Sequence, residues 1–359
     1  MAQYQRDVQV NVVRPTKPLV YGDFTKVLYL TNEIDKELKR YSTLEEVGTD
    51  FTKLSKIYAG LEIATSQTDF DGNGIKPNYW FCGGFIPKVG TTTEIEEFFS
   101  NATETGYYGI VLPFYDEKLV EWLALYLNRV SKYAIVVAPD ENAVTDKLKS
   151  SDRIFFMYEN KTDGPLDLFG LTAHTFWQGP AGRWKDRRIV GVSASVPNDV
   201  TLESKLLEKG INATVTKAGY TAVTNGSWCA DGEMHADQRI KIDSIVHDVE
   251  LNLQRLMIQE KNLFMDTRGV SKVEAVLDRV MIQKGKENIL AVDNSGNYLY
   301  QITVPSIEDT DPNTGLTTDD FISRVLRNVV VKFTISTEVE QIIVTLVWHD
   351  EPITTGGNE

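Results

Sequence analysis

The most chemistry-like spacing in the sequence is an acidic run near residue 70 that partly matches a calcium-binding loop. Asp69, Asp71, Asn73 and Gly74 follow the pattern D-x-D-x-N-G, the first half of such a loop. A bidentate Glu normally closes the loop at the twelfth position, because calcium takes about six to eight oxygen ligands. Trp80 occupies that position here and offers no oxygen. We therefore interpret the run as a polar turn and expect no metal site.

Other reactive residues do not occur at the spacings that their chemistry needs. The segment Gly84–Thr91 has glycines near phosphate-loop spacing, but it lacks the G-K-[ST] ending that brings a lysine to a phosphate. The sequence contains no G-x-S-x-G elbow and no dinucleotide G-x-G-x-x-G after a strand pattern. Cys229 and His235 alone do not make a zinc site. The histidines are scattered, at His174, His235, His247 and His349, and His247 is expected at the surface. We expect no catalytic residue and no cofactor.

Three tryptophans suggest a binding platform, but a simpler interpretation exists. Trp177 precedes the segment 178–188, Trp184 lies within it, and Trp228 follows later in the chain. Aromatic rings in such a group can stack on a sugar or a base. They also pack over loops as part of an ordinary core, and that is the interpretation we favour.

Composition limits the classes of partner. The 359 residues include 51 acidic and 37 basic side chains, for a formal net charge of −14, which argues against non-specific binding to nucleic acid. The two cysteines provide no disulfide framework and are expected to be buried thiols. The N-terminus has no secretory pattern, and the most apolar stretch is interrupted by charges, so we expect no membrane insertion.

Residues 26–195 alternate between apolar runs and helical patterns, which predicts an α/β layer with a largely parallel sheet. The expected strands are 27–31, 79–85, 108–114, 133–139, 153–158 and 188–194. Three helices are expected between them. The first begins at a Thr93/Glu96 capping box and the third is capped by Asp140. Their inward residues are Ile95, Phe98, Phe99 and Ala102, then Leu119, Val120, Leu123, Ala124 and Leu127, then Ala143, Val144 and Leu148.

The rest of the chain is organised around residues 200–259. A short helix ends at Gly210, a polar hairpin follows over 213–223, and a turn over 225–232 leads into a helix of about 22 residues, roughly 33 Å long. Its apolar stripe is Ile242, Ile245, Val246, Val249, Leu253, Leu256 and Met257.

A second long helix follows, with a capping box at Ser271 and Glu274 and an end at Gly285. The remaining expected elements are a hairpin over 289–304 with its turn at 294–297, an acidic loop over 308–315, a short helix carrying Asp319 and Asp320, and strands over 325–337 and 339–349.

Both ends of the chain read as strands without an obvious local partner. Residues 4–13 alternate, with Val8, Val10 and Val12 on one face, and Pro15 and Pro18 separate this strand from the body. The last strand is apolar on both faces, with Ile342, Val344, Leu346 and Trp348 on one of them. Such an edge would aggregate unless it were always covered. The N-terminal strand is either an edge of its own domain or an arm that pairs with another subunit.

The order of elements resembles the contractile-tail sheath proteins of phages and related injection machines. The similarity covers about residues 190–349 and the N-terminal strand, through RRIVGVSASVPNDVTLESKLLEKGIN, GYTAVTNGSWCADGEMHADQRIKIDSIVHDVELNLQRLM and KFTISTEVEQIIVTLVW. The resemblance implies an α/β (α+β overall) fold: an N-terminal arm and linker over 1–18, an α/β outer body over 19–199, an inner domain with long helices and antiparallel strands over 200–337, and a C-terminal arm and tail over 338–359.

The resemblance also implies a function. The chain would form stacked hexameric rings around a tail tube, with the arms joining a hairpin of neighbouring subunits and the linker at Pro15 and Pro18 acting as a hinge. Implied partners are other copies of the chain, the tail tube protein, and baseplate and tail terminator proteins, within a virion assembled in the bacterial host cytoplasm. The alternatives are an α/β enzyme of unknown reaction, which rests on fold class alone, and another tail structural protein of the tube or baseplate.

Overall fold

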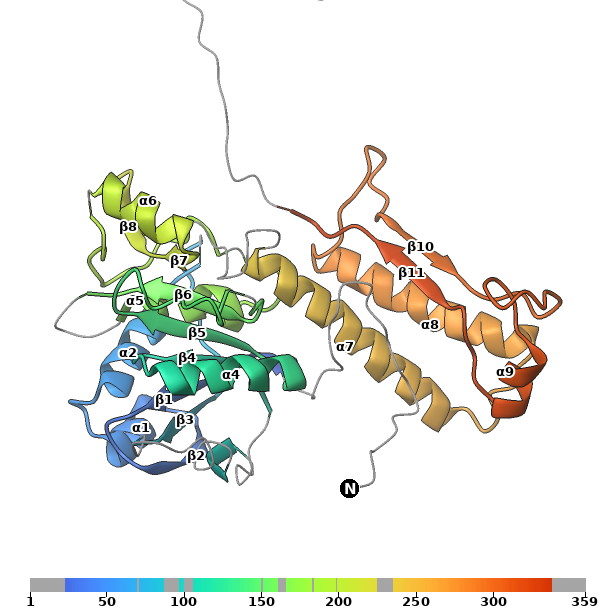
Figure 1. Ribbon diagram of the computed structural model, residues 1–359, viewed down its shortest axis with the longest axis horizontal. Coiled ribbons are helices and arrows are strands. Elements are labelled where there is room, and N and C mark those ends of the chain that lie inside the picture. Colours follow the sequence, from blue (N-terminus) through green and yellow to red (C-terminus); the bar gives the residue numbers. More distant parts are fainter. Residues whose placement is uncertain are drawn as a thin grey trace, which may run out of the picture.

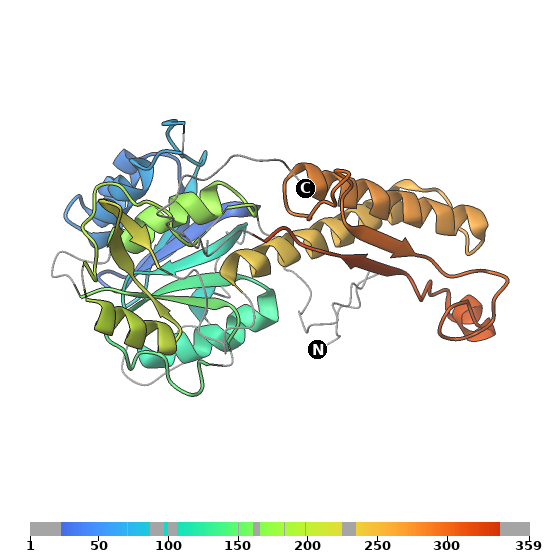
Figure 2. The same cartoon turned by 90° about the horizontal axis from the view of Figure 1, so that it is seen from above.

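The computed structural model describes residues 23–69, 71–86, 97–99, 106–149, 151–160, 166–182, 184–197, 199–224 and 235–337. These residues form an α/β body and an elongated lobe, joined by one long helix, α7 (Ala236–Gln259) (Figures 1 and 2). The mixed class predicted from the sequence is confirmed, because a mostly parallel sheet and separate antiparallel strands occur together.

The body is built on a twisted sheet in the order β2-β3-β1-β4-β5-β6-β7. Its strands are β1 (Asp23–Thr31), β2 (Lys36–Tyr41), β3 (Trp80–Gly84), β4 (Tyr107–Leu112), β5 (Tyr133–Ala138), β6 (Ile154–Tyr158) and β7 (Ile211–Asn212). All neighbours pair in parallel except β2, which is antiparallel to β3. The central strands are apolar runs buried on both faces, as expected for a parallel sheet with helices on both sides.

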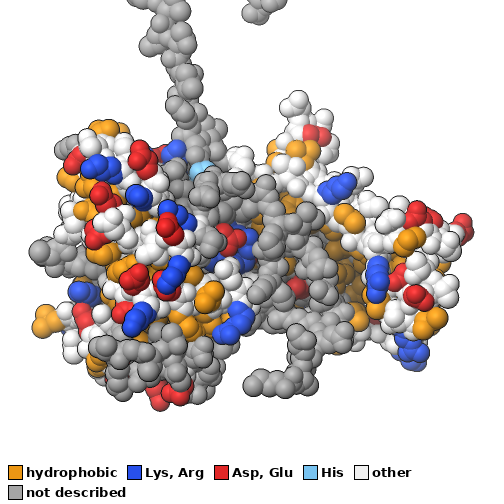
Figure 3. All heavy atoms as spheres, viewed as in Figure 1, with side chains coloured by type: hydrophobic (Ala, Val, Ile, Leu, Met, Phe, Trp, Pro, Cys, Tyr) orange, Lys and Arg blue, Asp and Glu red, His pale blue; other side chains and the backbone are white. Residues whose placement is uncertain are grey.

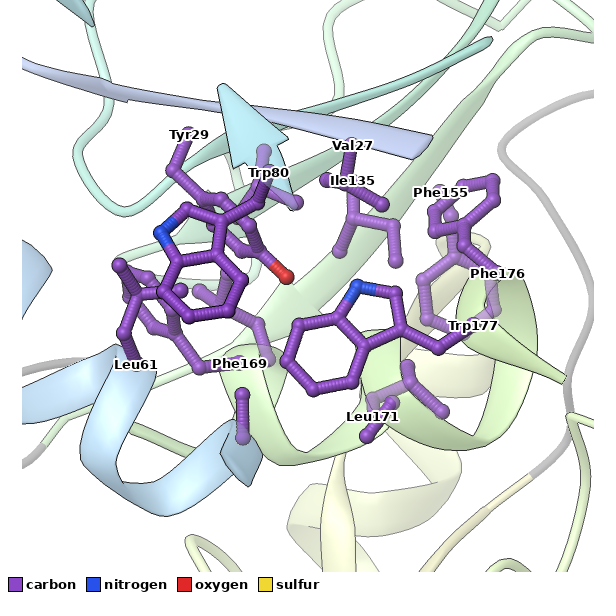
Figure 4. Packing of buried hydrophobic residues seen from close by; sticks show 14 of the residues in the cluster. Val27, Tyr29, Leu61, Trp80, Ile135, Phe155, Phe169, Leu171, Phe176 and Trp177 are labelled. Carbon is purple, nitrogen blue, oxygen red and sulfur yellow. The ribbon is translucent and has the colours of Figure 1, made fainter. Parts of the chain in front are cut away.

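Helices cover both faces of this sheet. One face packs against α1 (Leu44–Phe51), α2 (Lys56–Thr65), α5 (Leu166–Thr172) and the π-helix η1 (Ala173–Trp177). There Trp80 and Trp177 stack 6.2 Å apart, beside Tyr29 and Phe169 (Figure 4). The other face packs against α4 (Glu117–Val130) and α6 (Val200–Glu208). The inward residues predicted for α4 are all buried, and Asp116 caps the helix by accepting a bond from the Leu119 N–H at 2.9 Å.

Two predictions in the body are wrong. Residues 188–194 form no strand and contribute only a single bridge between Arg188 and Ala222. Residues 140–149 form turns instead of a helix, although Ala143, Val144 and Leu148 are buried as expected. The Asp140 carboxylate accepts a bond from the Asn142 N–H at 2.7 Å, a local turn bond that competes with helix formation. Of the helix predicted from Thr93, the structure describes residues 97–99, which are helical, with Phe99 buried.

The elements after residue 199 follow the predicted order. Helix α6 is followed by β7, and a hairpin of β8 (Thr214–Lys217) and β9 (Tyr220–Val223) comes next. Helix α7 is 24 residues long, about 36 Å at 1.5 Å per residue. Ile245, Val246 and Val249 of the predicted stripe are buried, whereas Met257 in its last turn is exposed.

Helix α8 (Thr267–Lys286) begins and ends at other residues than predicted. Its N-cap is Asp266, whose carboxylate accepts a bond from the Gly269 N–H at 3.0 Å, so the Ser271/Glu274 capping box is wrong. Gly285 lies inside the helix, and a Cβ there would meet the Tyr298 ring at 2.4 Å. This glycine therefore permits a close approach, and Asn288, with φ of 59°, takes the left-handed conformation that follows the helix end.

The lobe is completed by β10 (Tyr300–Thr303), α9 (Thr318–Ser323) and β11 (Val330–Phe333). The predicted short helix with Asp319 and Asp320 is confirmed as α9, capped by Thr317. The hairpin over 289–304 is present, with its turn held by the Asp293 carboxylate. The regular strand β11 is shorter than the predicted 325–337, although an isolated bridge extends it to Ile335.

Besides the two clusters on the faces of the large sheet, a third hydrophobic cluster fills the lobe between α7, α8 and the β10–β11 strands. Residues 200–224 pack on the body and the third cluster begins in α7, so a boundary within α7 would suit the packing better than one at 199/200. The division into domains stays a prediction. In the part of the chain that the structure describes, no helix is both long and apolar enough to cross a bilayer.

Candidate assembly surface

Among the described residues, the two-stranded sheet of β10 and β11 has open edges. The strands pair antiparallel, with Gln301 opposite Lys332 and Thr303 opposite Val330, and no third strand joins them among the described residues. The sheet lies alongside α8 on the outside of the lobe (Figure 1). An open edge presents unpaired backbone donors and acceptors, which makes it a template for another strand.

The hydrogen bonds show which backbone groups face the open edge of β11. The Thr334 N–H donates to Leu299 O at 2.9 Å, and Thr334 O accepts from the Ala291 N–H at 2.9 Å. A strand residue directs both backbone groups to one edge, and its neighbours direct theirs to the other. Phe333 and Ile335 therefore present their N–H and C=O groups to the edge away from β10.

The two faces of this sheet differ in polarity. Tyr300, Ile302, Val331, Phe333 and Ile335 pack against the third cluster, whereas Gln301, Thr303, Lys332 and Thr334 are exposed. The Tyr300 hydroxyl donates to the Asp278 carboxylate of α8 at 2.6 Å, and burial together with this bond raises the pKa of Tyr300 to about 12. A strand added at either edge would therefore meet one apolar face and one polar face.

The arm residues predicted from the sequence fall outside the described residues. These are Val8, Val10 and Val12, the hinge residues Pro15 and Pro18, and Ile342, Val344, Leu346 and Trp348. The described chain begins at Asp23 with β1 and ends at Thr337, shortly after β11. The Ser336 N–H still donates to Ile289 O at 2.8 Å, so the last described residues continue the pairing of β11.

The motifs weighed for chemistry have structural roles where they are described. The Asp69 carboxylate accepts from the N–H groups of Asn73 and Asp71 at 2.8 and 3.0 Å, and these bonds lower the pKa of Asp69 in a polar turn. Within the described ranges, no three His, Cys, Asp or Glu side chains group as metal ligands do. Trp177 and Trp184 are both buried in the core.

The burial of Cys82 and of His247 can be compared with the positions expected from the sequence. Cys82 is buried, as expected, and burial raises the pKa of its thiol. His247 was expected at the surface, but it is half-buried with its ring edge-on to Phe24, 5.7 Å between centroids, and burial lowers its pKa. Cys229 and Trp228 are not among the described residues.

Sequence reasoning missed a buried ionic network where α7 crosses the amino ends of β4 and β6. Arg153 donates to both Asp243 oxygens, at 2.7 and 3.2 Å, and the Tyr108 hydroxyl donates to Asp243 at 2.8 Å. Arg239 lies 3.4 Å from Asp243 and 3.0 Å from Asp152. Burial and the neighbouring Asp243 charge raise the pKa of Tyr108. Burial alone would lower the pKa of Arg153, but Asp243 raises it. The i, i+4 spacing of Arg239 and Asp243, around the buried Ile240, is the signal that sequence could have offered.

A second surface of the lobe is apolar at its far end. Met257, Ile258, Phe264, Phe321 and Ile322 are large and exposed there. Figure 3 shows apolar and charged side chains interspersed at this end of the molecule.

Comparison with known proteins identifies the fold. No family model and no curated protein matches the sequence. A chain of the 6-fold symmetrised baseplate structure of the anti-feeding prophage (AFP) superimposes with a TM-score of 0.68 and 16% identity, over 97% of this chain and 99% of that chain. A chain of the AFP helical sheath in the contracted state superimposes with a TM-score of 0.68 and 13% sequence identity, over 97% of this chain and 99% of that chain. A chain of the PVC sheath complex in the contracted state, from an extracellular contractile injection system, superimposes with a TM-score of 0.66 and 12% sequence identity. The match covers 98% of this chain and 99% of that chain. The chain has the fold of these proteins along nearly its whole length.

Proposed function

We propose that this protein is a structural subunit of a contractile sheath, built from many copies of the same chain. The carrying observation is the β10–β11 sheet, whose open edges offer backbone groups to further strands. The similarity along nearly the whole chain supports this proposal, because the matched chains come from the AFP baseplate, the AFP helical sheath and the PVC sheath complex. Contraction in such a sheath needs no nucleotide, since the contacts between subunits supply the free energy.

The arms are the segments that we propose to fill the open edges. The N-terminal strand alternates Val8, Val10 and Val12 with polar residues, which matches a sheet that is covered on one face and wet on the other. The C-terminal strand is apolar on both faces, so its second face needs cover as well, which a neighbouring copy would supply. Strand addition of this kind pairs backbone groups and lets alternate side chains set the register.

The finer assignments follow from the same proposal. The subunits form hexameric rings stacked around a tail tube, with baseplate and tail terminator proteins at the two ends. Pro15 and Pro18 hold the hinge between arm and body, and Ile342, Val344, Leu346 and Trp348 make contacts in a neighbouring subunit. The α/β body faces outward and the lobe faces the tube. Assembly takes place in the bacterial cytoplasm, and the finished particle is a virion or a related extracellular device.

Polar residues at the carboxyl ends of the parallel strands hold local structure, which also supports a structural role for the chain. Ligands in open α/β sheets bind at that edge. Here Asp116 caps α4, the Tyr115 hydroxyl donates to Ala143 O at 2.7 Å, and Asp140 holds a turn. These groups serve local structure, so we propose that the chain is not an enzyme.

The experiment is assembly of the purified protein, followed by negative-stain microscopy. The intact chain is expected to form striated cylinders, and a chain lacking residues 1–14 is expected to remain folded and give only monomers or loose rings. Val10→Asp should block cylinders in the same way, because it places an unpaired charge on the covered face. The matched control is Asn11→Asp, which adds the same charge on the wet face and should assemble. Normal cylinders from Val10→Asp would contradict the arm assignment, and compact particles from the intact chain would contradict the sheath role.

A further inference from the structure

Helix α7 belongs to two hydrophobic cores at once. Ala236, Ile240 and Val246 lie in the core beneath the large sheet, whereas Ile245 and Val249 lie in the core of the lobe. The helix is continuous over its 24 residues, so the lobe follows any rotation of its N-terminal half. The angle at which the helix crosses the sheet therefore sets where the β10–β11 strands stand relative to the body.

Apolar contacts do not fix such an angle well, because hydrophobic attraction has no direction. At the crossing, however, α7 carries four buried polar residues, Arg239, Lys241, Asp243 and Ser244, which we name the polar belt. Each is no more than 2% exposed. Arg239 and Asp243 form the network with Arg153, at the amino end of β6, and with Tyr108 of β4.

The other two residues of the polar belt face the lobe. The Lys241 ammonium donates to Ser336 O, beyond the end of β11, at 2.9 Å and lies 3.3 Å from Asp237. The Ser244 hydroxyl accepts a bond at 2.6 Å from Lys284 of α8, a buried lysine that also pairs with Asp248 at 2.6 Å. The polar belt thus bonds the body on one side of α7 and the lobe on the other.

These bonds add little to the stability of the fold, but they can fix the orientation of α7 relative to the sheet. Removing two charges from water costs about as much free energy as their attraction returns, so apolar residues of similar size often stabilise a fold as well or better. An arginine that grips both oxygens of a carboxylate does so in one plane and at one distance. A slide or a rotation of α7 would break the Arg153–Asp243 pair while leaving much of the apolar contact in place.

We propose that the polar belt is an orientation lock: Arg153, Tyr108 and Asp243 are positioning residues that set the angle between body and lobe, and with it the geometry in which copies of the chain can assemble. The second half of this statement rests on the proposed sheath function. The first half concerns the isolated chain and can be measured without assembly.

The test replaces the lock by apolar groups of similar size, in the variant Tyr108→Phe, Arg153→Met and Asp243→Leu. Arg239 keeps Asp152 as its partner in this variant. Spin labels are placed at Leu125→Cys in α4 and Ile322→Cys in α9, which are 74% and 76% exposed, in a background that carries Cys229→Ser. Dipolar electron spin resonance then measures the distribution of distances between body and lobe, and a thermal melt measures stability.

We expect the triple variant to melt at or above the midpoint of the unchanged chain, to show a shifted or broadened distance distribution, and to fail to form regular cylinders. The control is Glu121→Leu with Lys147→Met, which removes an exposed ion pair within the body and should leave the distribution unchanged. A triple variant with the unchanged chain's distribution would overturn the proposal, as would a broadened distribution together with normal cylinders. If the unchanged chain forms no cylinders, the sheath role fails, and the distance distribution alone decides the lock.

Discussion

The substitution Gly285→Ala tests the close contact between α8 and the Tyr298 ring, which lies just before β10. A methyl group at this position would lie 2.4–2.5 Å from Cγ, Cδ1 and Cδ2 of Tyr298. Carbon atoms in good contact stand about 3.5–4.0 Å apart, so the ring would have to retreat by about 1 Å or more. Tyr298 lies two residues before β10 and packs on the third cluster, so the displacement would reach the β10–β11 sheet.

Two opposing terms set the size of the effect. Replacing glycine by alanine inside a helix stabilises it by up to about 1 kcal/mol, because the unfolded backbone loses freedom. Overpacking a closed site costs about 1–3 kcal/mol. We expect the free energy of unfolding to fall by about 1 kcal/mol, with faster amide hydrogen exchange over residues 291–303.

Urea unfolding and exchange mass spectrometry measure these two quantities. Gly48→Ala in α1 is the control, since a Cβ there meets the nearest side-chain atom, Cε2 of Tyr58, at 3.1 Å and the ring can give way. That variant should be as stable as the unchanged chain or more so, with normal exchange over residues 291–303. If Gly285→Ala raises stability as the control does, Tyr298 does not need the space and our account of Gly285 is refuted.

Two further predictions concern charged groups. Arg153→Met alone should lower the free energy of unfolding in urea by about 3 kcal/mol, because the buried Asp243 loses its bidentate partner and keeps only Tyr108 and the more distant Arg239. The triple variant should not lose this stability, and equal losses would contradict the buried pairing. Asp50 has a pKa lowered from 3.8 to about 2 by hydrogen bonds from Lys36 and Tyr41. Its interactions therefore stabilise the fold above about pH 4 and are lost as the pH falls toward 2. Asp50→Asn should cost about 1 kcal/mol at pH 7, after allowance for solvent screening, and should flatten the acid limb of the stability profile; an unchanged acid limb would contradict the shift.

The elements that sequence predicted well are those in which one property repeats. Strands β1, β4, β5 and β6 were found as short, nearly continuous apolar runs, because a strand covered on both faces carries apolar side chains at successive positions. Helices α4 and α7 were found from apolar stripes at helical spacing. Predictions of start and end residues were weaker. Ser271 and Glu274 have capping-box spacing, yet α8 begins earlier, after Asp266, whose carboxylate accepts a bond from the Gly269 N–H.

The polar belt of α7 shows the limit of pattern reasoning. Arg239 and Asp243 have the i, i+4 spacing of an ion pair, which also occurs on exposed helix faces, and Lys241 lies on the opposite side of the helix. The spacing indicates that Arg239 and Asp243 can pair, but it does not show that all three side chains are buried. They are buried because β4 and β6 approach from one side and α8 and β11 from the other, in segments distant along the chain. Only the tertiary structure could bring their partners to them.

For this protein, sequence alone determined the α/β class and much of the order of its elements, because short apolar runs and apolar stripes at helical spacing are local features of the sequence. Tertiary structure decided the open edges of the β10–β11 sheet, the role of Gly285 and the pairing of Asp243 with Arg153. Those features depend on which distant segments meet, and a contact between distant segments leaves no period in either one.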